Sequence, residues 1–146
     1  MKKINIILGD DDEDDHMIFK EAINEIKLDS VLNMIEGGIE LMEHLLDPKS
    51  ELPDIVFLDL NMPCKDGVQC LSEIRASEKL KNLAVIIYST SSSPKDIEEC
   101  FFGGANAYIK KQNNFKNLKT ILHKVLSLNL NSYGSKPNME NFEIKI

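Results

Sequence analysis

Acidic, hydroxyl and basic side chains directly follow apolar segments at several separate places in the sequence. Asp10 and Asp11 follow the first such segment, Asp59 ends a later one, and Ser89 and Lys111 follow two others. Three carboxylates brought close together repel one another, and a divalent cation relieves that repulsion. A lysine and a hydroxyl group beside them could spread the charge of a phosphoryl group. These residue types predict a phosphate site that uses Mg²⁺, with Mn²⁺ as the alternative ion.

Asp59 is the acid best placed to act as a nucleophile, because it stands alone at the end of the most apolar segment. A carboxylate that attacks phosphorus forms an aspartyl phosphate. Asp10 and Asp11 are then predicted to be ligands of the metal ion. Residues 12–15 are also acidic, and we interpret them as charges that complement the dipole at the start of a helix.

The elements that must position these side chains follow from the spacing of the apolar residues. Short apolar runs indicate strands at residues 4–8, 31–35, 55–60, 83–88 and 107–109. Apolar residues at helical spacing follow each run, which predicts five helices. Alternating strands and helices require right-handed crossovers and build a parallel sheet that helices cover on both faces. The predicted fold class is α/β with a doubly wound five-stranded parallel sheet, which binds ligands at its carboxyl edge.

Length and composition favour one globular domain. The chain has 146 residues, of which 42% are hydrophobic and 28% charged. We assign residues 1–130 to this domain and residues 131–146 to a polar C-terminal tail. The tail is either disordered or, because residues 142–146 alternate, paired with a sheet edge. No apolar run is long enough for a membrane span or a secretion signal, so we expect a cytoplasmic protein.

The charges are unevenly distributed along the chain. Residues 1–63 contain 16 acidic and 5 basic residues, whereas residues 64–146 contain 8 acidic and 12 basic residues. The acidic half suits a cation site, and the basic half suits an anion or a protein contact. The last predicted helix carries few lysines, and its apolar residues are needed for a core, so nucleic acid is a disfavoured partner.

Four strings of residues resemble the motifs of the response-regulator receiver domain and occur in the order of that family. They are IILGDDD at 6–12, DLNMP at 59–63 followed by Gly67, IIYS at 86–89, and GANAYIKK at 104–111. The resemblance runs from about residue 3 to residue 128. It implies a flavodoxin-like sheet with the strand order 2-1-3-4-5 and five helices.

The resemblance implies a role for four residues around the metal. Asp59 would be the phosphoacceptor and a metal ligand. Asp11 would be a direct ligand, and Asp10 a second acid that acts mainly through water. Asn61 would offer its backbone carbonyl to the ion.

The resemblance also implies a switch. Ser89 would donate to a phosphoryl oxygen, Lys111 would pair with the phosphoryl charge, and Tyr108 matches the aromatic residue that moves inward when the hydroxyl residue is drawn to the phosphate. The chain departs from the family at Gln112, where proline is usual. A cis peptide before a non-proline residue is costly, so we expect a trans bond and a shifted loop. If the loop is shifted, Lys110 is the alternative residue for pairing with the phosphoryl charge.

Together these inferences predict a single-domain response regulator of a two-component phosphorelay. It would accept a phosphoryl group from a sensor histidine kinase or a phosphotransfer protein and then change its affinity for a downstream protein target, alone or as a homodimer. It would not be an enzyme, apart from promoting its own phosphorylation and dephosphorylation.

Two alternatives remain open. One is a protein-binding module that works without phosphorylation. The other is a haloacid-dehalogenase-like phosphatase, whose paired acids match Asp10 and Asp12, although Asp14 stands where that family needs a hydroxyl group. A calcium loop is disfavoured, because Asp15 occupies the position that requires glycine.

Overall fold

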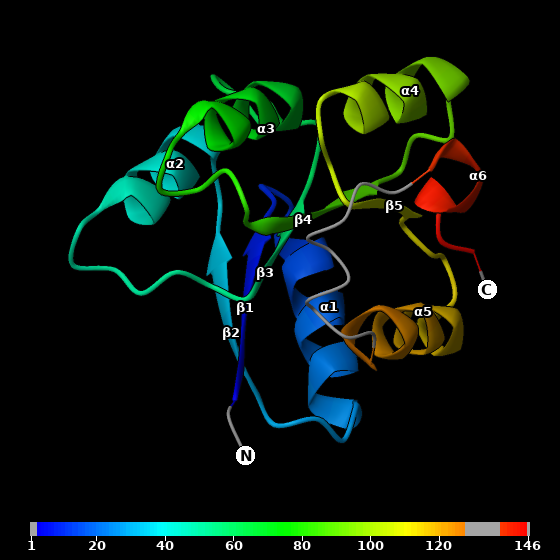
Figure 1. Cartoon of the computed structure of the whole chain (residues 1–146). Helices are drawn as coiled ribbons and strands as arrows, with labels where there is room; N and C mark the ends of the chain where they lie inside the picture. The colour runs from blue at the N-terminus through cyan, green and yellow to red at the C-terminus, as the bar shows by residue number, and fades with distance from the viewer. Residues whose placement is uncertain (1–2, 128–137, 146) are drawn as a thin grey trace.

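The computed structural model describes residues 3–127 and 138–145, and its centre is a five-stranded parallel sheet (Figure 1). The strands are β1 (Ile4–Gly9), β2 (Ser30–Ile35), β3 (Ile55–Leu58), β4 (Ala84–Ser89) and β5 (Ala107–Lys110). They lie in the order β2-β1-β3-β4-β5, with every neighbouring pair parallel. The predicted fold class and strand order are confirmed.

Helices cover both faces of the sheet, as predicted. They are α1 (Glu13–Glu25), α2 (Gly38–Leu46), α3 (Gly67–Ala76), α4 (Pro94–Phe102), α5 (Phe115–Ser127) and the single turn α6 (Met139–Phe142). α1 and α5 pack on one face, and α2, α3 and α4 pack on the other, so each face buries its own apolar cluster (Figure 1). Of the helices described, none is long and apolar enough to cross a membrane.

The central strands β3 and β4 are buried along their whole length. Helices cover them from both sides, which explains why their sequences are continuous apolar runs that do not alternate. The outer strand β2 keeps several partly exposed positions. Because parallel strands end at the same edge, the residues that follow β1, β3 and β5 arrive at one side of the sheet.

Local capping interactions set the start of several helices. Asp12 caps α1 by accepting hydrogen bonds from two backbone N–H groups of the first turn. Asp66 and Gln69 form a reciprocal capping box at α3. Ser93 caps α4, and Pro94 is its first residue, as the sequence predicted.

The strand ends differ by one or two residues from the predicted ones. β3 ends at Leu58, so Asp59 and Leu60 lie just beyond it, and β4 runs on to Ser89. The predicted end of β3 came from apolarity, whereas pairing defines the strand. Leu60 is buried without being part of the strand.

Residues 138–145 fold back onto the outer side of β5. After α6, Glu143 forms a parallel bridge with Tyr108, and the Ile144 N–H donates to the Tyr108 carbonyl at 2.9 Å. This is the kind of edge contact that the alternation at 142–146 favours. Residues 131–137 of the expected tail, and residue 146, lie outside the described residues.

Candidate functional site

Three carboxylates meet at the carboxyl edge of the sheet. Asp10 and Asp11 follow β1, and Asp59 follows β3, which pairs directly with β1. One carboxylate oxygen from each residue lies within 4.8 Å of the other two. Asp10 and Asp59 are 0% and 4% exposed, whereas Asp11 is exposed to solvent. The fold therefore brings the three acids together at one place that water can reach.

Backbone contacts fix the positions of the two buried acids. The Asp10 N–H donates to the Ile35 carbonyl at 3.0 Å, and the Asp59 N–H donates to the Gly9 carbonyl at 2.8 Å. Both bonds carry the strand pairing one residue past the sheet. A Cβ on Gly67 would lie 2.3 Å from the Asp59 carbonyl oxygen. The loop after Asp59 can therefore close on α3 only because residue 67 has no side chain.

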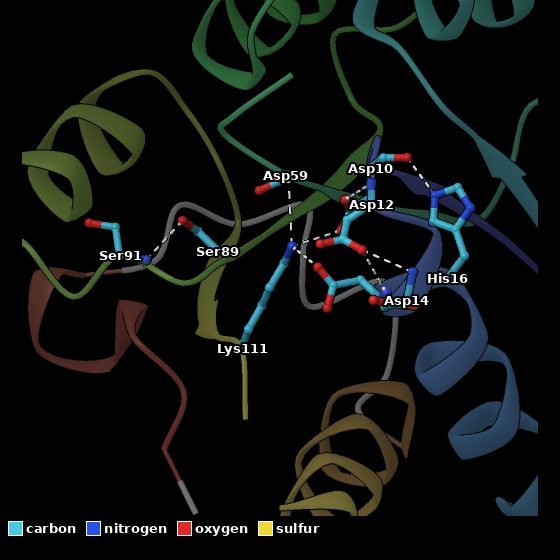
Figure 2. Close-up of polar contacts among 9 residues, drawn as sticks. Asp10, Asp12, Asp14, His16, Asp59, Ser89, Ser91 and Lys111 are labelled. Carbon is cyan, nitrogen blue, oxygen red and sulfur yellow. Dashed lines mark hydrogen bonds and ion pairs between the residues drawn. The ribbon is translucent and has the colours of Figure 1, made fainter. Parts of the chain in front are cut away.

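Lys111 directly follows β5 and points its ammonium group at these acids (Figure 2). Nζ lies 2.9 Å from Asp10 Oδ2, 3.7 Å from Asp59 Oδ2 and 2.6 Å from Asp15 Oδ2. Burial on its own lowers the pKa of Lys111, but the bonds to Asp15 and Asp10 and the charge of Asp59 raise it above its ordinary value. Lys111 is therefore a cation at any pH at which the protein works.

The neighbours of Lys111 hold the lysine in this direction. The Lys111 N–H donates to the Ser89 carbonyl at 2.7 Å, which extends the pairing of β4 with β5. The peptide bond before Gln112 is trans, and no described peptide bond is cis. The Gln112 side-chain amide donates to the Lys110 carbonyl at 2.7 Å. Lys110 is exposed, so the structure brings Lys111 and not Lys110 to the acids.

The environment of Asp59 opposes its ionisation. Burial, followed by the charge of Asp10, raises the pKa of Asp59 from 3.8 to about 6, although Lys111 and a backbone hydrogen bond from Asn61 lower it. The single ammonium group therefore does not neutralise the cluster fully. A cation bound beside Asp59 would lower this pKa and keep the carboxylate ionised.

The donor set fits a hard divalent cation. Mg²⁺ prefers carboxylate and carbonyl oxygens and keeps several of its waters. Oδ2 of Asp10 is buried and faces the Lys111 ammonium group at 2.9 Å. Asp11 is exposed, so hydrated ions can reach the cluster. Asn61 already contacts Asp59 through its backbone N–H, so it lies next to the same oxygens.

Ser89 and Tyr108 are connected to each other through Ser91. Ser89 is fully buried, and its Oγ accepts a hydrogen bond from the Ser91 N–H at 3.1 Å. The buried Tyr108 donates its hydroxyl proton to the Ser91 carbonyl at 2.9 Å. Figure 2 shows Ser89 and Asp10 on opposite sides of Lys111. The Ser89 hydroxyl is therefore engaged with Ser91.

Two residues of α1 contact the site although the sequence did not point to them. Asp15 makes the shortest of the three ion pairs of Lys111. His16 is buried, and its Nε2 contacts the carbonyl oxygen of Asp10. The interpretation of residues 12–15 as a dipole complement suits Asp12, which caps the helix, but not Asp15. Nothing in the sequence signals this contact, because it depends on how the first turn of α1 meets the end of β5.

Comparison with known proteins matches this arrangement to one family. The family model for the response regulator receiver domain matches residues 6–123. Response regulator Rcp1 of Synechocystis sp. is 30% identical over 117 residues, which cover 77% of this chain and 80% of Rcp1. Chemotaxis protein CheY-3 of Vibrio cholerae is 29% identical over 124 residues, which cover 85% of this chain and 92% of CheY-3.

Solved structures agree with the sequence relatives. The phosphorylated cyanobacterial phytochrome response regulator RcpA is 30% identical, with a TM-score of 0.78 over 85% of this chain and 91% of RcpA. The Mn²⁺-bound form of Rcp1 is 28% identical, with a TM-score of 0.78 over 86% of this chain and 93% of Rcp1. The chain therefore belongs to the response regulator receiver domain family, the signal-receiving module of two-component systems.

Proposed function

We propose that Asp59 accepts a phosphoryl group from a phosphohistidine on a sensor histidine kinase or a phosphotransfer protein. The observation that supports this most strongly is the meeting of Asp59 with two further acids and the Lys111 ammonium group. An Asp59 carboxylate oxygen attacks phosphorus, and the bond from phosphorus to the imidazole nitrogen breaks with its electron pair going to the imidazole. Later attack by water on phosphorus releases inorganic phosphate and restores the carboxylate.

The proposed cofactor is Mg²⁺, with Mn²⁺ as a substitute. Asp11 and Asp59 would be direct ligands, Asp10 would act mainly through water, and Asn61 would offer its backbone carbonyl. When bound, the ion supplies positive charge against the repulsion between these acids and the phosphoryl oxygens. The three carboxylates that meet at the site support this assignment, as does the Mn²⁺-bound form of the relative Rcp1.

Three further residues of the chain respond to the phosphoryl group. Lys111, 3.7 Å from the Asp59 oxygen, pairs with a phosphoryl oxygen. Ser89 turns its hydroxyl from Ser91 to the phosphoryl group and donates to it. Because Tyr108 is bonded to Ser91, this movement reaches the outer strand β5. We assign the switch to Ser89 and Tyr108.

The output of this switch is a change of affinity for a downstream protein target. Receiver domains are signalling modules, and the catalysis proposed here is limited to the phosphorylation and dephosphorylation of the chain itself. The proposed location is the cytoplasm, where the phosphohistidine donors of the stand-alone relatives are expected to act. Target binding by a homodimer is compatible with the proposal, and native mass before and after phosphorylation would decide it.

No observation favours a phosphatase of the haloacid-dehalogenase kind. The second acid that such an enzyme needs would be Asp12, and its carboxylate is used to cap α1. The other alternative is a protein-binding module that works without phosphorylation. The experiment that follows distinguishes this alternative from the proposed function.

Intact-mass spectrometry after incubation with acetyl phosphate tests the proposal. We expect one phosphoryl group to add to the wild type when Mg²⁺ is present and none to add to Asp59→Asn. Asp29→Asn is the matched control, because it makes the same chemical change at an exposed carboxylate far from the site. Addition to Asp59→Asn would assign another acceptor. No addition under any condition would favour the binding module.

A further inference from the structure

Residues 138–145, which we call the strap, lie along the outer edge of β5 between α4 and α5 (Figure 1). Glu143 forms the parallel bridge with Tyr108, and the Ile144 N–H donates to the Tyr108 carbonyl at 2.9 Å. On the α5 side, Lys124 Nζ donates to the Lys145 carbonyl at 3.2 Å. The strap therefore consists of the single turn α6 followed by a short addition to the sheet.

Phe142 anchors the strap. Its side chain is fully buried, although residues 139–141 before it are exposed. Its ring centroid lies 5.3 Å from that of Phe101 on α4 and 6.3 Å from that of Tyr108 on β5. Aromatic rings at these separations attract each other, and burying them removes apolar surface from water. The docking of the strap therefore depends mainly on Phe142, with the partly buried Ile144 packed against the other apolar cluster and few hydrogen bonds beside them.

Tyr108 is enclosed between the sheet and the strap. Its ring is fully buried, and its carbonyl accepts a hydrogen bond from the Ile144 N–H of the strap. Its hydroxyl donates a hydrogen bond to the Ser91 carbonyl. Phe142 packs against this ring and covers it on the side of α6. Ser91 also bonds to Ser89 at the acidic site. A continuous chain of contacts thus joins the strap to the residues around Asp59.

We propose that the strap is a built-in ligand of the β5 edge that holds Tyr108 in its buried orientation and docks more tightly when Asp59 is phosphorylated. The second half rests on the proposed function, in which movement of Ser89 toward the phosphoryl group favours an inward Tyr108. Since both events favour the same orientation of Tyr108, each strengthens the other.

The proposal also specifies the kind of partner that this face accepts. An extended protein segment would add to β5 as the strap does, with an aromatic side chain in the place of Phe142. It must displace the strap first. Such a partner therefore binds the unphosphorylated chain more tightly than the phosphorylated one.

The test follows the exchange of the Ile144 amide hydrogen by NMR in the full chain. In the unmodified protein we expect protection of this amide in the wild type and its loss in Phe142→Ala. Met139→Ala is the matched control, because it shortens an apolar side chain of the same turn that is 43% exposed, and it should keep the protection. Acetyl phosphate with Mg²⁺ should slow the exchange about tenfold in the wild type and leave Phe142→Ala unchanged.

Intact mass of the same samples separates this inference from the proposed function. Addition of a phosphoryl group without a change in Ile144 exchange would overturn the coupling and leave Asp59 as the acceptor. If no phosphoryl group adds, the proposed function and the coupling of the strap to phosphorylation are both overturned. Docking of the strap is then still tested by Ile144 exchange in unmodified Phe142→Ala. An unprotected Ile144 in the wild type would overturn docking. Protection that grows with protein concentration and a dimeric mass would put the strap on a second copy and overturn docking within one chain.

Discussion

At the scale of single residues, the charge of the site is not balanced. One ammonium group, that of Lys111, faces three carboxylates and lies nearest to Asp15 at 2.6 Å and farthest from Asp59 at 3.7 Å. Of these three acids, Asp59 lies farthest from the ammonium group, so the lysine lowers its pKa too little to offset burial and the charge of Asp10. A cation bound beside Asp59 would lower its pKa.

Replacing Asp59 with Asn should stabilise the fold at neutral pH in EDTA. The pKa of Asp59 is about 6 in the folded chain and 3.8 without the fold, so this group favours folding most below pH 3.8 and loses that contribution as the pH rises through about 6. We expect Asp59→Asn to gain about 1–3 kcal/mol near pH 7.5 and much less near pH 4. Urea unfolding at the two pH values measures this. An equal gain at both, or the same gain in Asp29→Asn, would contradict it.

Replacing Asp15 with Asn should raise the fraction of chain that is phosphorylated at a fixed acetyl phosphate concentration. Asp15 competes for the Lys111 ammonium group, and its loss frees the lysine for Asp59. A partly exposed ion pair of this kind contributes about 1 kcal/mol, so the equilibrium ratio should rise up to about fivefold. Asp14→Asn, an exposed neighbour, should change little. A lower phosphorylated fraction in Asp15→Asn would instead identify Asp15 as a residue that positions Lys111.

At the scale of elements, the close approach of α3 to the acceptor loop is the tightest constraint near the site. Gly67 is the first residue of α3, and its N–H donates to the Leu60 carbonyl at 3.1 Å. The sequence predicted the helix and the strand from apolar spacing. It could not predict how closely they meet, because that distance depends on packing across the sheet.

Gly67→Ala should destabilise the chain and reduce phosphorylation, because its Cβ would lie 2.3 Å from a backbone oxygen that cannot move aside. We expect a loss of about 1–3 kcal/mol in urea unfolding, as for other overpacked sites. Gly37→Ala is the matched control. The Cβ there would meet the end of the Glu40 side chain, which can turn away. Equal losses in both variants would show that backbone freedom and not contact with Asp59 is the cause.

At the scale of the whole molecule, the sequence predicted what depends on local signals. The five strand-helix units came from apolar spacing, and the meeting of Asp10, Asp59 and Lys111 came from the common edge of parallel strands. The contact of Asp15 with Lys111 joins residues 96 positions apart and depends on how α1 packs beside α5, the helix that follows Lys111. The seating of Phe142 depends on a space between α4 and β5 that exists only after folding.

Mg²⁺ should raise the melting temperature of the whole chain, because only the folded state brings the carboxylates together. A hundredfold excess over the dissociation constant stabilises a fold by about 2.7 kcal/mol, or about 5–10 °C for a chain of this size. Differential scanning calorimetry should show this rise for the wild type and Asp29→Asn and lose most of it for Asp11→Asn. A similar rise in all three would indicate a general salt effect.

The strap also changes how the sheet ends. An edge strand offers unpaired N–H and C=O groups to other chains, and a sheet with two open edges can add neighbours on both sides without limit. In this molecule the Tyr108 carbonyl on the β5 side is already occupied by Ile144, so among the described strands β2 is the edge left fully open. A sheet with one open edge can join a single neighbour and then stops. The strap therefore covers part of one of the two edges at which another chain could pair with this sheet.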